Sequence, residues 1–365
     1  MVEWKKLGDV CTFNRGRTIT AKEAVEGSVP VIAGGQAPSY YHNEANRSGE
    51  SITVAGSGAY AGFVIYWNQP IFVSDAFTVD PVKSLLHKYV FQWLKMNQQK
   101  IFETQKGAGV PHVHGKDIAG FVIPIPPLSE QTRIVGILDT FTAAIENLKQ
   151  QIAERRKQYE YYRNELLDLE GKEGVEMKTL KEVFDTRNGY TPSTKNELFW
   201  DNGTIPWFKM EDIRDNGRIL KDSNLHITPQ AVKGKGLFKA NSIILATSAT
   251  IGEHALITVD YLSNQRFTNF YPKKNYEKLL DMKFVYYYMF VIDEWCKQHI
   301  NQGGFASVDM SGLYNLSFPI PSLEEQSRIV SILDTFEATI ANLEAQLKER
   351  EKQYEYYRNK LLTFE

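Results

Sequence analysis

The chain has 365 residues, of which 42% are hydrophobic and 24% are charged, and its formal net charge at pH 7 is −2. This length and composition are typical of a soluble globular protein with two domains. The nearly neutral charge argues against a strong overall attraction to nucleic acid, although it leaves room for a local basic face.

Cysteine content and apolar patterning indicate the cellular compartment of the protein. Cys11 and Cys296 lie far apart and neither belongs to a CxxC pair, so the sequence predicts neither a disulfide framework nor a zinc site. The N-terminus lacks an apolar signal core, and no apolar run reaches the ~20 residues that span a bilayer. We therefore expect a cytoplasmic protein with no membrane association.

The first part of the chain, residues 1–127, contains short apolar runs separated by glycine and asparagine turns. Such runs predict a β-rich domain, which we call the first domain. One helix is expected inside it at residues 88–102, and a glycine-rich loop follows at residues 106–121.

A heptad pattern begins after the proline-rich segment at residues 124–127. Apolar residues recur in steps of four and three from Ile134 to Leu169, which predicts one long helix over residues 128–170. About 40 residues at ~1.5 Å per residue give a rod of roughly 60 Å. The seam contains one arginine, Arg155, which we expect near solvent or paired with a carboxylate because an unpaired buried guanidinium is costly.

The second half of the chain repeats this order after a glycine-containing linker. Residues 171–321 predict a second β-rich domain, with a helix expected at 279–300, and residues 322–365 predict a second long helix. The two long helices, which we call the rods, match without a gap, and Arg350 repeats the arginine in the seam. The domains match far less well: residues 51–66 parallel 241–257, with Ser57 opposite Ser248, and residues 72–79 parallel 261–270.

Two copies of one unit in tandem predict pseudo-two-fold symmetry. We expect an α+β fold of two β-rich domains, each followed by a long helix, with the two helices packed as an antiparallel coiled coil. The alternative is that each helix docks on the core of its own domain. The expected seam residues are Leu138, Phe141, Ile145, Leu148, Leu333, Phe336, Ile340 and Leu343.

Motifs of the common enzyme classes are missing from the sequence. It contains no GxGxxG after a strand, no Walker loop, no HExxH, no GxSxG, and neither the adenine-methyltransferase tetrapeptide nor the usual nuclease carboxylate motif. His112 and His114 alternate but have no further ligand nearby, so no metal site is predicted. We therefore expect a chain without catalytic activity of its own.

Polar and basic loop residues of the two domains are candidates for contacts with double-stranded DNA. Lysine and arginine neutralise phosphates, while Arg, Gln, Ser and His can read base edges in the major groove. In the first domain the candidates are Ser57, Tyr60, Lys106, His112, His114 and Lys116. In the second domain they are Lys209, Arg214, Lys233, Lys235, Ser248, Thr250, Arg266, Gln302 and Ser307. For each of them, plain solvated surface is the open alternative.

The string KQYEYYRN occurs at residues 157–164 and again at 352–359. Its middle tyrosine, Tyr161 or Tyr356, falls off the apolar seam and should stand exposed. An exposed tyrosine repeated at the same place in both rods suggests a partner-docking surface, with Arg163 and Arg358 beside it. The alternative is solvated decoration of a coiled coil.

These residues together resemble one known family. The two copies of IPxP[PS]LxEQxRIVxILDTF, each followed by a helix ending in QYEYYRN, are similar to the conserved regions of the specificity subunit of type I restriction-modification systems. ITVAGSGAYAGFVIYW with SDAF in one half, and GYTPSTKN, IPWFKMEDI and FASVDM in the other, resemble its target-recognition domains.

The resemblance implies a non-catalytic subunit whose two domains each read one half of a bipartite DNA site. The helices would set the spacing and dock two methyltransferase subunits, and a restriction (translocase-nuclease) subunit would complete the complex. This chain would bind no cofactor, and S-adenosylmethionine would belong to the methyltransferase subunits. The alternative outside this family is a coiled-coil protein-interaction scaffold without DNA binding.

Overall fold

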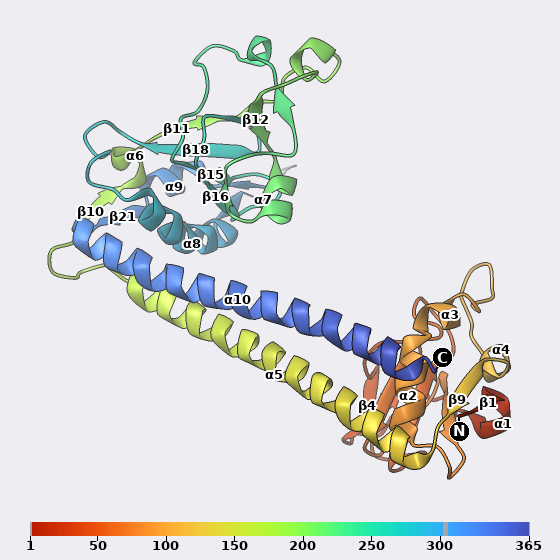
Figure 1. The fold of residues 1–365 in the computed structure, drawn as a ribbon. Coiled ribbons are helices and arrows are strands. Elements are labelled where there is room, and N and C mark those ends of the chain that lie inside the picture. The colour runs from red at the N-terminus through yellow and green to blue at the C-terminus, as the bar shows by residue number, and fades with distance from the viewer. Residues whose placement is uncertain (1, 302–305, 365) are drawn as a thin grey trace. The chain divides into compact units, whose positions relative to one another are not determined.

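The computed structural model describes residues 2–301 and 306–364. The chain forms two compact units (Figure 1): the first contains residues 1–151 and 343–365, and the second contains residues 152–342. Each unit therefore includes one β-rich domain together with a segment of both long helices. Within the described chain, no helix combines the length and apolar character needed to cross a membrane.

The first unit is built on a four-stranded antiparallel sheet in the order β2-β8-β5-β6. Its strands are β2 (Cys11–Arg15), β8 (Ala76–Pro81), β5 (Glu50–Ala55) and β6 (Val64–Asn68). A smaller sheet in the order β4-β3-β7 joins β4 (Tyr40–His42), β3 (Val29–Ile32) and β7 (Phe72–Val73), and β1 (Glu3–Lys6) pairs with β9 (Val122–Ile125). The helices of this domain are α1 (Leu7–Val10), α2 (His87–Met96), α3 (Gln98–Phe102) and α4 (Gly115–Ile118).

The second unit has a five-stranded sheet in the order β11-β18-β15-β16-β13. Its strands are β11 (Phe184–Asn188), β18 (Phe267–Pro272), β15 (Ser242–Ala246), β16 (His254–Ile257) and β13 (Ile219–Leu220). The smaller pairings join β14 (His226–Ile227), β12 (Ile205–Phe208) and β17 (Leu262–Ser263), then β10 (Glu176–Thr179) with β21 (Ser317–Ile320), and β19 (Ile300–Asn301) with β20 (Ser307–Val308). The helices are α6 (Leu180–Val183), α7 (Met210–Asn216), α8 (Met282–Gln298) and α9 (Met310–Asn315), with 3-10 turns η1 (Glu197–Phe199) and η2 (Pro229–Ala231).

The strand order β2-β8-β5-β6 in the first unit recurs as β11-β18-β15-β16 in the second. The smaller three-stranded sheets also correspond, because β3 pairs with β7 in parallel and β12 pairs with β17 in parallel. The duplication seen faintly in the sequence of the domains is therefore a duplication of topology.

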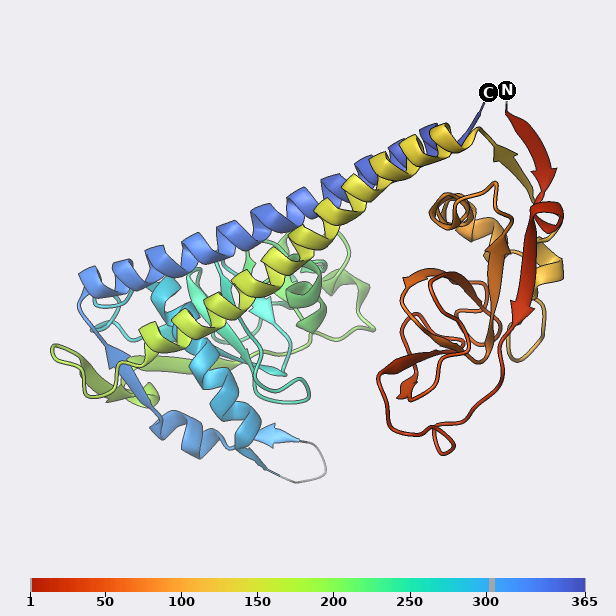
Figure 2. The same ribbon diagram turned by 90° about the horizontal axis from the view of Figure 1, so that it is seen from below.

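The rods are α5 (Leu128–Leu167) and α10 (Leu323–Leu362), which run side by side in opposite directions (Figure 2). In the first unit the rings of Phe141 and Tyr357 stack with centroids 5.3 Å apart, and in the second the rings of Phe336 and Tyr162 stack at 5.5 Å. These are equivalent residues of the two copies with the roles of the helices exchanged. The α+β fold with an antiparallel helix pair is confirmed.

The rods also dock on the domains, so the two packing modes considered for them occur together. In the first unit the core of Tyr89 and Trp93 on α2 includes Ile134 and Leu138 of α5 and Leu362 of α10. The second unit repeats this arrangement, with α8 packed against Ile329 and Leu333 of α10 and Leu167 of α5. All eight expected seam residues are buried or half-buried: Leu138, Phe141, Ile145, Leu148, Leu333, Phe336, Ile340 and Leu343.

The expected single helix at residues 88–102 is interrupted. α2 ends at Met96 and α3 begins at Gln98, because the side chain of Asn97 turns back and donates to the carbonyl of Trp93 at 2.9 Å. α7 was not expected, since its seven residues are too few for a periodic pattern. It starts where the carboxylate of Asp212 accepts from the Lys209 amide at 2.8 Å.

Candidate nucleic-acid interface and partner surface

A buried glutamine fixes the entry of each rod into its domain. The side chain of Gln131 accepts from the Leu86 amide at 2.9 Å and donates to the carbonyls of Ser84 and Pro126 at 3.0 and 2.9 Å. Gln326 makes the same three bonds, to the Asp281 amide and to the carbonyls of Leu279 and Pro321, each at 2.8 Å. Both glutamines are fully buried. Each therefore ties three chain segments together at the point where a rod meets a domain.

Three loops of the first domain meet just beyond the ends of β5 and β8. The Gly56 amide donates to the Asp75 carbonyl at 3.1 Å, and the Gly56 carbonyl accepts from the Val113 amide at 3.1 Å. Ser57 forms an isolated bridge with His112. We call this meeting point the recognition junction of the first domain, because it gathers several of the sequence candidates.

The side chains at this junction are polar and accessible. The Ser57 hydroxyl donates to the carboxylate of Asp75, and the rings of His112 and His114 stack with centroids 6.3 Å apart. Both histidines are exposed, and Asp75 is half-buried. A hollow of about 240 Å³ lies among them, lined also by Arg15. Asp75 and Arg15 were not among the sequence candidates. A charged residue next to a buried strand is a pattern that could have identified them.

The second domain has the same junction on the same backbone frame. The Thr247 amide donates to the Arg266 carbonyl at 3.0 Å, and the Thr247 carbonyl accepts from the Val308 amide at 2.9 Å. Ser248 forms an isolated bridge with Ser307. The candidates Ser248, Arg266 and Ser307 are thus brought together, with Thr250 two residues away on the same loop. Gln302 lies outside the described residues.

The other candidates of the first domain lie around this junction. The backbones of Lys106 and His112 exchange hydrogen bonds of 3.0 and 2.8 Å, and Tyr60 is 46% exposed in the loop after β5. The Lys106 ammonium contacts the Asp117 carboxylate at 2.5 Å. Burial opposes ionisation of Asp117, but bonds from Lys106 and from the His114 amide outweigh it and lower its pKa. Lys116 is exposed on α4.

The remaining candidates of the second domain lie on separate loops. Lys209 follows β12 directly, and the neighbouring Phe208 carbonyl accepts from the Asn264 amide at 3.0 Å, which places it near the Arg266 loop. Arg214 is exposed on α7, while Lys233 and Lys235 are exposed in the segment after η2.

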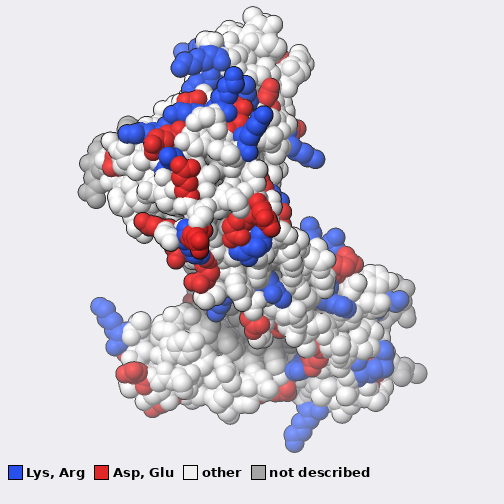
Figure 3. All heavy atoms as spheres, turned by 90° about the vertical axis from the view of Figure 1, so that its left-hand side faces the viewer, with Lys and Arg blue, Asp and Glu red and all other residues white. Residues whose placement is uncertain are grey.

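A basic hollow of the second domain includes the sequence candidate Lys235 together with basic residues that were not among the candidates. It measures about 580 Å³ and is lined by Arg187, Lys235, Lys239 and Lys274 together with two acidic side chains. The Arg187 guanidinium lies 3.9 Å from the centroid of the Phe238 ring and donates to the Gly236 carbonyl at 2.9 Å. Figure 3 shows basic side chains gathered near the top of the face it presents, with acidic side chains among them. Charges of both signs are therefore mixed on that part of the surface.

The described part of the chain contains no group of three or more His, Cys, Asp or Glu side chains placed to hold a metal. The second domain does contain a buried ionic cluster. The Asp293 carboxylate accepts from His254 Nδ1 at 2.7 Å and lies 3.4 Å from Arg218 Nη1. His254 is fully buried and packs at 4.7 Å against the ring of Phe290. This cluster joins α8 to β16.

The exposed tyrosines of the rods lie where the sequence placed them. Tyr161 is 61% exposed and Tyr356 is 60% exposed. Arg163 and Arg358, which lie two residues after these tyrosines, are half-buried. The guanidinium of Arg163 lies 4.5 Å from the Phe290 centroid, and that of Arg358 lies 5.4 Å from the Tyr354 centroid. Both arginines therefore pack on aromatic rings of their own unit.

The arginines of the seam avoid burial. Each guanidinium lies over a phenylalanine of the other rod at 5.8 Å, Arg155 over Phe336 and Arg350 over Phe141. Arg350 is exposed, and Arg155 is half-buried with a hydrogen bond of 2.9 Å to Gln158. This matches the expected position near solvent.

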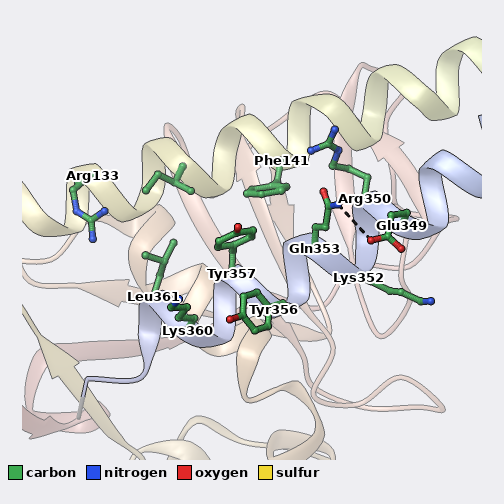
Figure 4. A pocket seen from close by; sticks show the side chains of 11 residues that line it. Arg133, Phe141, Glu349, Arg350, Lys352, Gln353, Tyr356, Tyr357, Lys360 and Leu361 are labelled. Carbon is green, nitrogen blue, oxygen red and sulfur yellow. Dashed lines mark hydrogen bonds between the residues drawn. The ribbon is translucent and has the colours of Figure 1, made fainter.

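A groove runs along the rods in the first unit (Figure 4). It measures about 810 Å³ and its lining includes Phe141 and Tyr357, whose rings face each other between the two helices, and also Tyr356, Arg133 and Lys352. The groove thus combines aromatic surface with basic groups, which suits the protein-protein contacts in which Tyr and Arg are enriched.

The chain is similar to known proteins along both of its halves. The family model of the type I restriction modification DNA specificity domain matches residues 1–155 and 172–352. The EcoprrI type I restriction enzyme specificity subunit of Escherichia coli is 51% identical over 201 residues, which is 52% of this chain and 50% of that protein. The match therefore spans half the length of that relative.

Two further relatives match over more of their length. Another type I restriction enzyme specificity subunit of Escherichia coli is 36% identical over 306 residues, 78% of this chain and 72% of that protein. A Haemophilus influenzae protein named as a type I restriction enzyme specificity subunit is 30% identical over 397 aligned positions, 100% of this chain and 96% of that protein.

Solved structures share the fold at low identity. The S subunit of a type I restriction-modification system from M. genitalium aligns with a TM-score of 0.62 at 17% identity, covering 100% of this chain and 97% of that one. A chain from a study of assembly of the type I system aligns with a TM-score of 0.65 at 18% identity, covering 99% and 97%.

Proposed function

Because the chain belongs to the family of type I restriction-modification DNA specificity subunits, we propose that it is the DNA-recognition subunit of a type I restriction-modification complex. Each domain reads one half of a bipartite site in double-stranded DNA. The family membership rests on the match over both halves of the chain. It does not favour the alternative of a protein-interaction scaffold without DNA binding.

One observation supports the proposed roles of the domains and the rods. The recognition junction occurs twice on one backbone frame with different side chains, whereas the rods are nearly identical in sequence. Two domains that recognise different DNA sequences need the same backbone arrangement with different side chains. A partner that is present twice needs two equal docking surfaces.

Equal rods therefore support docking of two methyltransferase subunits, one beside Tyr161 and one beside Tyr356. Each exposed tyrosine ring packs edge-on against the ring of the next tyrosine at 5.3 Å, so each surface presents a pair of aromatic rings. Arg163 and Arg358 contribute at the edges of these surfaces. In this proposal the contact area of each docked subunit includes a tyrosine of one rod and the seam of the other.

In this proposal the partner subunits carry out catalysis. The methyltransferase subunits bind S-adenosylmethionine and methylate adenine, and the restriction (translocase-nuclease) subunit adds cleavage. The chain itself supplies recognition and assembly and holds no cofactor. Lysine and arginine side chains around the junctions contribute phosphate contacts, which position DNA without reading it.

The direct test is a domain exchange. Residues 171–318 would be replaced by the equivalent segment of another specificity subunit, and the hybrid expressed with the methyltransferase subunit in a host without other adenine methylation. Long-read sequencing should show a methylated motif in which one half-site is new and the other is retained. A motif changed in both halves would overturn the assignment of one domain to one half-site.

The rods, each 40 residues long, are proposed to set the spacing between half-sites. Removing one heptad from the middle of both rods keeps the seam in register. The spacer of the methylated motif should then change in length. An unchanged spacer in a folded, active complex would contradict the proposal.

A further inference from the structure

We infer that the recognition junction is the place where each domain reads a base pair, and that the two domains read it with opposite hydrogen-bonding character. Asp75 acts as the acceptor in the first domain and Arg266 acts as the donor in the second. This inference rests on the proposed function and adds to it which residues select the base and what kind of base they select.

The backbone shows that Asp75 and Arg266 are equivalent. Ala55 and Ala76 are paired at the ends of β5 and β8, and one residue further the Gly56 amide donates to the Asp75 carbonyl at 3.1 Å. In the second domain Ala246 is paired with Phe267 at the ends of β15 and β18, and one residue further the Thr247 amide donates to the Arg266 carbonyl at 3.0 Å.

A third loop, which contains Val113 in the first domain and Val308 in the second, completes the same backbone hydrogen-bond pattern. The Val113 amide donates to Gly56 in the first domain, and the Val308 amide donates to Thr247 in the second. One frame therefore presents a carboxylate in one domain and a guanidinium in the other. Charge reversal at a position whose backbone is retained is what selection for two different ligands produces.

In the first domain the acceptor is held in place. The Ser57 hydroxyl donates to Oδ2 of Asp75, and the carboxylate lines the hollow of about 240 Å³ beside His112 and His114. In the major groove the groups that donate to a carboxylate are the exocyclic amines of cytosine and adenine. His112 and His114, which line this hollow, are both exposed, so a base edge can approach it from solvent.

In the second domain no described residue engages the donor. Arg266 is exposed, and its guanidinium makes no hydrogen bond or ion pair with any residue in 2–301 or 306–364. Its backbone amide is fixed by the Asn264 side chain at 3.0 Å, so the start of the side chain is positioned while its end is not engaged. The planar fork of arginine matches O6 and N7 of guanine in a bidentate fashion. The half-site of the second domain should therefore contain a G·C pair.

The experiment uses the complex of the full chain with its methyltransferase subunit and a DNA library randomised in both half-sites. Arg266→Gln removes the donor fork, and Arg266→Lys keeps the charge but not the fork. Both should reduce the preference for guanine at one position of one half-site, by roughly 5- to 150-fold for the glutamine variant. Lys278→Gln removes another exposed charge of the same domain and should leave the motif unchanged.

The first domain provides the reciprocal test. Asp75→Asn keeps an oxygen that accepts from Ser57 but adds an amide donor, so it should change base preference at one position of the other half-site. Glu44→Gln, at an exposed position of the same domain, is the matched control. Thermal unfolding of each variant establishes that the domain is intact.

The inference is overturned if Arg266→Gln weakens binding equally for all sequences and Arg266→Lys restores it, because that pattern, with a salt dependence reduced by about one counterion, identifies a phosphate contact. A wild-type motif without any G·C pair in the half-site of the second domain also overturns it. Failure of the proposed function looks different: the wild-type complex itself would then show no sequence preference.

Discussion

The glutamine that ties each rod to its domain offers a sharp test of how the molecule is held together. Replacing Gln326 by alanine removes three hydrogen bonds, of which the one to the Pro321 carbonyl is fully buried and the other two are partly buried. A stranded buried group costs about 1–3 kcal/mol and a partly solvated one less, so the expected loss is about 2–4 kcal/mol. The loss should fall on the start of α8, where the amide of Asp281 is released, and on the first turn of α10, which carries Gln326.

Hydrogen exchange followed by mass spectrometry measures this locally. A loss of about 2–4 kcal/mol corresponds to roughly 30- to 700-fold faster exchange where the opening equilibrium, and not the opening step, sets the exchange rate. Gln326→Ala should show it at the first turns of α8 and α10, and Gln131→Ala should show it only at the start of α2 and α5. Ser327→Ala, at the exposed neighbouring position, should leave exchange unchanged. A change below about threefold, or equal changes in both units for either variant, would refute the reasoning.

Three further predictions follow from the described contacts. Tyr161→Ala and Tyr356→Ala should each weaken binding of the methyltransferase subunit by at least about tenfold in calorimetry without lowering the melting temperature, because both rings are about 60% exposed. Asp293→Ala should lower the free energy of unfolding by about 1–3 kcal/mol in denaturant titration, because it leaves the buried His254 Nδ1 without its partner. Burial raises the pKa of the Cys11 and Cys296 thiols from 9.0 to about 12; the unfolded thiols ionise first, so the free energy of unfolding should fall as the pH rises from about 9 to 12.

Each of these has its own control. Glu160→Ala, at an exposed position beside the tyrosine, should bind the methyltransferase normally, and equal weakening there would discount the tyrosine contact. Asp293→Asn keeps an acceptor for the histidine and should lose less stability than the alanine variant; equal losses would argue against the ionic cluster. Native thiols should resist alkylation at pH 8, and labelling as fast as in denaturant would contradict their burial.

Periodicity and repetition in the sequence determined the rods. The heptad pattern and the gapless repeat predict two long helices with equivalent seams, because a helical face is a local property with a fixed period. The strand-rich domains were predicted for the same reason, from short alternating runs with turn residues. The tyrosine off the seam was correctly expected to be exposed, since the position of a residue on a straight helix follows from its number.

Only the tertiary structure decided what the domains present to a ligand. The sequence placed Ser57 opposite Ser248, but the loops holding Asp75 and Arg266 differ in length, so their equivalence appears only through the hydrogen bonds to Gly56 and Thr247. The retained glutamine of each rod was visible in the repeat, yet its three partners come from distant segments. Local patterns fix helices and strands, whereas the meeting of loops depends on how sheets and helices pack, which no local pattern encodes.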